Sequence, residues 1–164
     1  IHVDHMRVAL PNGRQALREI VVHGGAAAIV PVDENGNVTL VRQHRVAVDE
    51  VMLEIPAGKL DHAGEEPLRC AQRELEEEAG LTAEHWTLLS PMITTPGFCT
   101  ERIGLYLATG LHRSRQHLDE DEFLNVVTVP LHEAVARVLS GELHDGKTAL
   151  GLLLAEKHLQ QAND

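Results

Sequence analysis

Residues Gly58–Leu81 read GKLDHAGEEPLRCAQRELEEEAGL, and this stretch predicts more about the fold than any other in the 164-residue chain. Pro67 suits the first turn of a helix, and apolar residues recur at helical spacing up to position 79, where a glycine follows that can end the helix in a left-handed cap. Glu74, Glu77 and Glu78 stand at i, i+3 and i+4, so they project from one face of this helix. Clustered carboxylates repel one another, but a group of oxygen ligands suits hard cations such as Mg²⁺ or Mn²⁺.

A solvated acidic helix is the plain alternative interpretation of any Glu-rich segment. Here, however, Arg73–Leu81 matches the pattern R-E-apolar-x-E-E-x-G-apolar at every specified position. At average residue usage such a match is expected in on the order of one window in ten million. The segment resembles the Nudix box, in which a glycine, five residues, a glutamate and seven residues precede this run. Glu65 stands eight positions before Arg73 as the box requires, but six residues separate it from Gly58, so we expect the Ala57–Gly58 turn to loop out by one residue.

The sequence on both sides of the box is similar to one branch of the family, the ADP-ribose pyrophosphatases. Glu54–Leu60 (EIPAGKL) resembles the segment that leads into their box, and Pro96, sixteen residues after Gly80, stands at the spacing that marks the ADP-sugar branch. Val41–Arg45 (VRQHR) and Arg18–Ile20 (REI) also resemble that branch. The resemblance therefore covers about the first 129 residues of the chain.

This resemblance implies a divalent metal, Mg²⁺ or Mn²⁺, held by glutamates of the box. The ligands that it implies are Glu74 and Glu78, then Glu77, with the Ala57 carbonyl and Glu65 in support. Arg73 is expected to orient the glutamates more than to touch the substrate.

Residues outside the box are candidates for substrate binding. Arg18 and Arg45 could hold phosphate, because a guanidinium fork matches phosphate oxygens, although either could equally be a surface arginine on a strand. Glu101, which follows the turn at Pro96, resembles the residue that contacts the terminal ribose; the alternative is a solvated loop acid.

The general base is expected in the acidic loop Asp119–Glu122, because metal ligation lowers the basicity of the box glutamates. Related pyrophosphatases carry a catalytic glutamate in the equivalent loop. This implies Glu120 as the first choice and Glu122 as the second, the latter also as a metal ligand; a solvated acidic loop is the alternative.

The hydrophobic pattern predicts a single α+β domain. The resemblance implies the Nudix fold, a mixed β-sheet between helices, for residues 25–164, preceded by a β-hairpin in residues 1–24 that we expect to form a homodimer. The other strands are expected at Gly25–Val32, Val38–Arg45, Val51–Ile55, Trp86–Thr95, Ile103–Thr109 and Phe123–Val129, with a helix from Leu131 to Gly141 and a last helix containing Leu150–Leu154.

Composition excludes several classes of partner. The formal charge of -11 argues against nucleic acid, and the apolar stretches are too short to cross a bilayer. The two cysteines are too few for a disulfide framework and suit a reducing compartment, so we expect a cytoplasmic protein.

The expected function is hydrolysis of ADP-ribose or a related nucleotide sugar to AMP and a sugar phosphate. GDP-mannose or another nucleotide sugar is the near alternative within the same chemistry. A non-catalytic module that binds nucleotide sugars is an alternative of another class, but such modules tend to lose box glutamates, and this chain keeps all of them.

Overall fold

The computed structural model describes residues 1–62, 64–118 and 123–162. The elements in chain order are β1 (His2–Ala9), β2 (Gln15–Val22), β3 (Ala26–Pro31), β4 (Asn37–Arg45), β5 (Glu50–Glu54), β6 (Ala57–Lys59), α1 (Pro67–Ala79), β7 (Leu81–Ile93), β8 (Arg102–Arg113), β9 (Leu124–Pro130), α2 (Leu131–Leu139) and α3 (Gly146–Ala162). No helix in the described part of the chain is long and apolar enough to cross a membrane.

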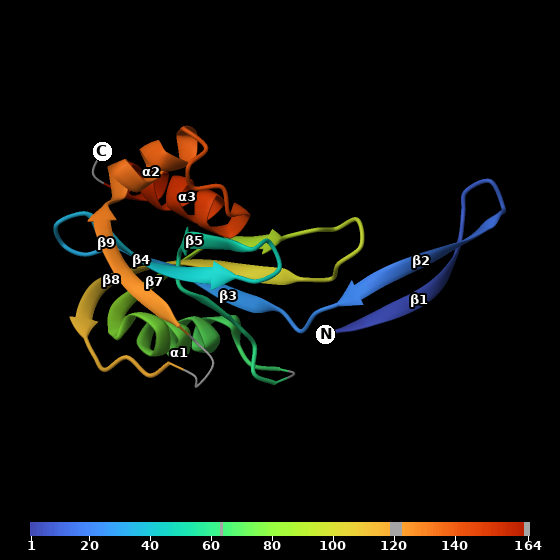
Figure 1. The fold of residues 1–164 in the computed structure, drawn as a ribbon, viewed down its shortest axis with the longest axis horizontal. Coiled ribbons are helices and arrows are strands. Elements are labelled where there is room, and N and C mark those ends of the chain that lie inside the picture. Colours follow the sequence, from blue (N-terminus) through green and yellow to red (C-terminus); the bar gives the residue numbers. More distant parts are fainter. Residues whose placement is uncertain (63, 119–122, 163–164) are drawn as a thin grey trace.

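The strands form two packed sheets and a separate hairpin. A four-stranded sheet has the order β6-β3-β8-β7; it is mixed, because β3 and β8 run parallel while β6 and β7 pair antiparallel with their neighbours. A three-stranded antiparallel sheet has the order β5-β4-β9. Helix α1 covers one side of the sheets and α2 with α3 covers the other (Figure 1). The expected α+β architecture is confirmed, with two sheets between the helices.

Strand β3 lies at the centre, and all of its residues are buried. Because side chains alternate along a strand, Ala27 and Ile29 pack with Leu75 on the α1 side. Val30 faces the opposite side, where it joins a core cluster that contains Leu152 of α3. The two-sided burial explains why β3 reads as a continuous apolar run.

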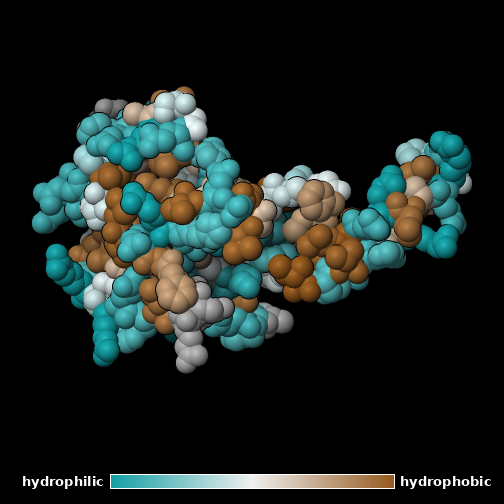
Figure 2. Space-filling model, viewed as in Figure 1, coloured by the Kyte–Doolittle hydropathy of each residue, from teal (hydrophilic) through white to brown (hydrophobic). Residues whose placement is uncertain are grey.

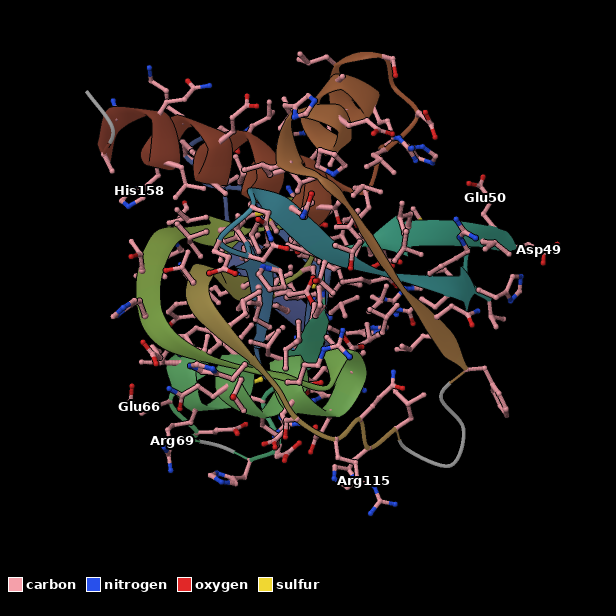
Figure 3. All side chains as sticks on the ribbon, turned by 90° about the vertical axis from the view of Figure 1, so that its left-hand side faces the viewer. Asp49, Glu50, Glu66, Arg69, Arg115 and His158 are labelled. Atoms are coloured by element: carbon pink, nitrogen blue, oxygen red, sulfur yellow. The ribbon has the colours of Figure 1, made fainter. Side chains whose placement is uncertain are left out.

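Helix α1 has the bounds that the sequence predicts. Pro67 occupies its first turn, and Gly80 ends it with a left-handed φ of 63°. Glu66 and Arg69 point away from the sheets on the outer side of this helix (Figure 3). The inner side therefore carries the core contacts, and the glutamates of the box lie toward the edge of the sheets.

One predicted turn and the predicted start of one strand were wrong. Ala57 and Gly58 do not form a turn but belong to the short strand β6, because they pair with Ala28 and Ala27 of β3. Strand β7 begins at Leu81 and not at Trp86, because β8 continues to Arg113 and supplies it with backbone partners.

The hairpin β1–β2 projects from the rest of the molecule (Figure 1). Its base is held by backbone hydrogen bonds between Val21 and the loop after β7: Val21 donates to Phe98 O at 2.7 Å, and Thr100 donates to Val21 O at 3.0 Å. Apolar side chains lie along it (Figure 2), and Val3, Met6 and Leu17 are about half exposed.

Candidate active site

A cavity of about 940 Å³ opens where α1, β6 and the start of α3 meet. Its wall includes Ala57, Gly58 and Lys59 of β6, Arg73, Glu74, Glu77 and Glu78 of α1, and Arg45, Glu101, Asp145 and Lys147 from other elements. Residues that the sequence places far apart thus share one cavity.

The glutamates of α1 form an acidic wall. Glu74 and Glu78 are largely buried, with 8% and 3% of their surface exposed. Glu78 accepts a hydrogen bond from the Ala57 backbone N–H at 2.9 Å, which ties α1 to β6. Glu77 lies one helical turn from Glu74 at the same cavity, so the i, i+3, i+4 spacing places all three carboxylates on one wall.

Gly58 leaves the space that the carboxylate of Glu74 occupies. A Cβ at this position would lie 1.8 Å from Glu74 Oε1, far inside van der Waals contact. Any other residue at position 58 therefore displaces Glu74. The box requires glycine at this position because the Glu74 carboxylate approaches the backbone closely, and not because the chain turns here.

Arg73 holds two of the glutamates in place. Its Nη1 donates to Glu74 at 2.7 Å and to Glu77 at 2.8 Å. Its Nε is buried and lies 3.6 Å from Glu65, too far for a hydrogen bond. Although burial disfavours its charge, the neighbouring carboxylates raise the pKa of Arg73 above its ordinary value. Arg73 thus contacts the glutamates of the acidic wall, and its orienting role stays a prediction.

Glu65 lies behind Arg73 and outside the wall of the cavity. Its carboxylate accepts a hydrogen bond from the Asp61 backbone N–H at 2.6 Å. Glu65 therefore closes the loop that leads from β6 into α1. The additional residue of the box lies within this loop, since β6 already holds Ala57 and Gly58 in the sheet.

The donor set fits a hard divalent cation. The candidate ligands offer only oxygen atoms, and the one thiol nearby is unsuitable as a ligand: Cys70 donates to the carbonyl of Lys59 at 3.3 Å, and burial, followed by the charge of Glu74, raises its pKa to about 12. Within the described ranges, no three acidic, histidine or cysteine side chains already form a metal cage. Arg73 and the Ala57 N–H are the groups that hold the carboxylates instead.

A network of charges forms the opposite wall. Arg45 donates to both oxygens of Glu54, from Nε at 2.7 Å and from Nη2 at 2.8 Å. Lys147 contacts Glu54 as well as Asp145, the latter at 2.9 Å. Burial alone would raise the pKa of Glu54, but Arg45 and Lys147 outweigh it and hold the pKa below its ordinary value. Glu54 is therefore an anion fixed between two cations.

Sequence reasoning found Arg45 but missed Glu54, Asp145 and Lys147. Lys147 meets Glu54 across 93 positions of sequence, and only the packing of α3 brings them together. The one local signal is Asp145 just before α3, whose carboxylate accepts from the Thr148 N–H at 3.0 Å as a helix N-cap does.

Glu101 lines a third part of the cavity. Thr94 Oγ1 donates to one of its oxygens at 2.8 Å, and His23 Nε2 lies 3.5 Å from the other. Pro96 is exposed in the loop between Thr94 and Glu101 and does not line the cavity. His23 and Thr94 were not found from the sequence.

Of the remaining predicted site residues, Arg18 does not line the described cavity. Arg18 is exposed on the hairpin, where its Nη1 donates to the Leu17 carbonyl at 3.0 Å. Glu120 and Glu122 lie outside the described residues. The segment before them reaches α1, because the His117 N–H donates to the Glu77 carbonyl at 3.0 Å.

The fold and the acidic wall define a class of hydrolase that works with a divalent metal. The NUDIX domain model matches residues 22–149, and the chain therefore belongs to the Nudix family. The resemblance to that family is confirmed, and membership implies dependence on a divalent metal.

Curated relatives cover most of the chain. It is 44% identical over 147 residues to an ADP-ribose pyrophosphatase of Bacillus subtilis (strain 168), covering 88% of this chain and 79% of that protein. An ADP-ribose pyrophosphatase of Mycobacterium tuberculosis is 43% identical over 150 residues, with 90% and 72% covered. A GDP-mannose pyrophosphatase of Yersinia enterocolitica is 34% identical over 155 residues, with 88% and 80% covered.

A solved structure described as an ADP compounds hydrolase has the same fold. The TM-score is 0.86 with 24% sequence identity, and the match covers 98% of this chain and 86% of that one.

Proposed function

We propose that the protein hydrolyses the diphosphate bond of ADP-ribose or a related nucleotide sugar, giving AMP and a sugar phosphate, with Mg²⁺ or Mn²⁺ as the divalent ion. The observation that carries this proposal is the pairing of an acidic wall on α1 with the fixed guanidinium of Arg45 across one cavity. The names of the relatives that are 44% and 43% identical support the choice of ADP-ribose.

The charges of the site explain why a metal is required. The chain carries a formal charge of -11, and its acidic wall would repel a diphosphate. A bound divalent cation supplies positive charge between the two and lowers the pKa of a water molecule. Glu74, Glu77 and Glu78 would hold it, with the Ala57 carbonyl in support. Glu65, which lies outside the wall of the cavity, would support them indirectly through Arg73, whose Nε lies 3.6 Å away.

Arg45 is the proposed phosphate contact on the opposite wall. Glu54 holds its Nε and Nη2, whereas its Nη1 has no hydrogen-bond partner among the described residues. A guanidinium fixed on two sides loses little entropy when the third nitrogen binds phosphate. Glu101, held by Thr94, is the proposed contact of the sugar.

The proposed general base is Glu120, with Glu122 as the second choice. Support comes from the chain before them, since His117 is bonded to the last turn of α1 only three positions before Glu120. A base here would take the proton of the attacking water beside the acidic wall.

We further propose a homodimer in the cytoplasm, formed through the hairpin of residues 1–24. The exposed apolar side chains of the hairpin support the dimer, and both cysteines, Cys70 and Cys99, are free thiols. In such a dimer, Arg18 would reach the second copy.

One experiment tests the proposed activity. The protein is incubated with Mg²⁺ and matched concentrations of ADP-ribose, GDP-mannose and other nucleoside diphosphate compounds, and products are identified by mass spectrometry. ADP-ribose should be among the best substrates and should yield AMP and ribose 5-phosphate. Much faster turnover of GDP-mannose would overturn the choice of substrate. Binding of ADP-ribose without cleavage under Mg²⁺ or Mn²⁺ would indicate a binding module.

A further inference from the structure

Lys147 stands where a lysine is electrostatically disfavoured. It is the second residue of α3, and the N-terminus of a helix carries partial positive charge that repels a cation. Its side chain is only 12% exposed, so the ammonium group is also largely withdrawn from water. Contacts with Glu54 and Asp145 compensate for both costs.

Glu54 is the group that joins Lys147 to the cavity. Its side chain is 1% exposed, and a carboxylate this deeply buried must be paired. Arg45 pairs with both oxygens, and Lys147 shares one of them, Oε2. The carboxylate therefore sits between two cations and has little freedom to turn away from either.

The start of α3 is also attached to the backbone beside Glu54. The Ile55 N–H donates to Thr148 Oγ1 at 3.0 Å, and that hydroxyl donates to Asp145 at 2.5 Å. These bonds keep Lys147 in register with Glu54. The network thus connects α3 to β5 and, through Arg45, to β4.

We propose that Lys147 is a positioning residue for diphosphate binding: through Glu54 it holds the guanidinium of Arg45 at the wall of the cavity, where Nη1 is left to bind phosphate. This inference rests on the proposed function, because the diphosphate is the group assigned to Arg45. Without Lys147, Glu54 can follow Arg45 toward solvent, where the Arg45 side chain is already 40% exposed. Binding of the diphosphate would then have to order the Arg45 side chain, and the entropy lost in doing so would lower the affinity.

Lys147→Met removes the ammonium group and keeps the apolar stem. With ADP-ribose as substrate, KM should rise about tenfold, because a charge-assisted contact is lost, while kcat stays within about threefold. Lys147→Arg should restore most of the affinity. The matched control is Lys157→Met, the same change at an exposed position of the same helix, which should leave both constants unchanged. Thermal unfolding of each variant checks that the fold is retained.

A double-mutant cycle with Glu54→Gln separates positioning from direct contact. If Lys147 acts through Glu54, then Lys147→Met should add no further rise in KM in the Glu54→Gln background. The double variant removes the ammonium group of Lys147 together with the carboxylate that it contacts, so neither group of this pair is left buried without the other. A tenfold penalty that persists in this background would mean that Lys147 touches the substrate itself, and would overturn the inference.

The four proteins of this cycle are the wild type, Lys147→Met, Glu54→Gln and the double variant. Titration of ADP into each of them measures binding without turnover. Its affinity should fall about tenfold in Lys147→Met and show the same non-additivity. If the wild type cleaves no nucleotide sugar but ADP binding follows this pattern, the proposed function fails and the role of Lys147 stands. Equal ADP affinity in wild type and Lys147→Met, or no binding to either, would overturn the role of Lys147.

Discussion

The backbone of Gly58 lies directly against the carboxylate of Glu74, and no space is left for a side chain at position 58. Because Arg73 fixes the carboxylate of Glu74, a methyl group at position 58 has to push aside a group that is already bonded. We expect Gly58→Ala to lower kcat by about 10-fold to 100-fold, as displacement of a catalytic ligand does, with a loss of stability near 1 kcal/mol.

Steady-state kinetics and urea unfolding measure these two effects. Gly24→Ala is the matched control, because nothing lies within 4 Å of a Cβ there. Equal activity of Gly58→Ala and Gly24→Ala would show that Glu74 can move without consequence.

Glu78 is the most buried carboxylate of the acidic wall. Glu78→Gln keeps its size and one hydrogen-bonding oxygen for the Ala57 N–H, but it removes a hard anionic ligand. Turnover should fall by about 100-fold or more, while circular dichroism and the unfolding midpoint stay close to wild type. Excess chelator should abolish wild-type turnover as well. Full activity in either condition is incompatible with a metal on this wall.

Glu120→Gln should lower kcat strongly, by about 100-fold, with little change in KM, because a general base acts in the transition state. The acidic limb of the pH–rate profile should be lost with it. Glu122→Gln is the natural comparison. Near-normal kcat in both variants would place the base elsewhere in the chain.

The first turn of α3 is stabilised by charge as well as by packing. Asp145 accepts from the Thr148 N–H at 3.0 Å, so Asp145→Ala should cost about 1–2 kcal/mol at pH 7. Burial by itself would raise the pKa of Asp145, but Lys147 and Thr148 outweigh it, and the net pKa lies below the ordinary 3.8. The contribution of Asp145 is therefore complete above that value and is lost as the pH falls through the lowered pKa.

Urea unfolding at pH 7, 5 and 3 tests this pH dependence. The gap in unfolding free energy between wild type and Asp145→Ala should be constant from pH 7 to 5 and smaller at pH 3. Glu34→Ala, in an exposed turn, should show a difference within about 0.5 kcal/mol throughout. A gap that widened toward low pH would contradict the assigned direction of the pKa.

Local signals explain which elements the sequence predicted. Helix α1 was predicted with the correct bounds because Pro67, Gly80 and the apolar spacing between them act within the helix itself. Strand β6 escaped detection because it has three residues and depends on pairing with β3, which lies some thirty positions earlier. Lys147 was missed because its role depends on a contact with Glu54, which lies 93 positions away in the sequence.

At the scale of the whole molecule, the hairpin β1–β2 has too small a hydrophobic core to be stable by itself. Two strands that contact the rest mainly at their base are marginal alone, and Val3, Met6 and Leu17 are about half exposed. We expect these side chains to pack against a second copy, so light scattering at micromolar protein should give twice the 18.0 kDa of one chain.

Leu17→Asp should shift this equilibrium toward the single chain and weaken substrate binding if Arg18 serves the second copy. Leu139→Asp, the same change at a leucine of α2 that is 75% exposed, should leave the mass unchanged. A wild-type mass of 18.0 kDa under these conditions rejects the dimer.

The buried thiol of Cys70 makes this protein easy to label at one position. Cys70 has no exposed surface and burial raises its pKa to about 12, so we expect maleimides not to attack it at neutral pH. Cys99 is partly exposed and pairs with Val21 at the base of the hairpin. A fluorophore or spin label added to the unmodified chain would therefore attach at Cys99 and report on the hairpin without any engineered cysteine.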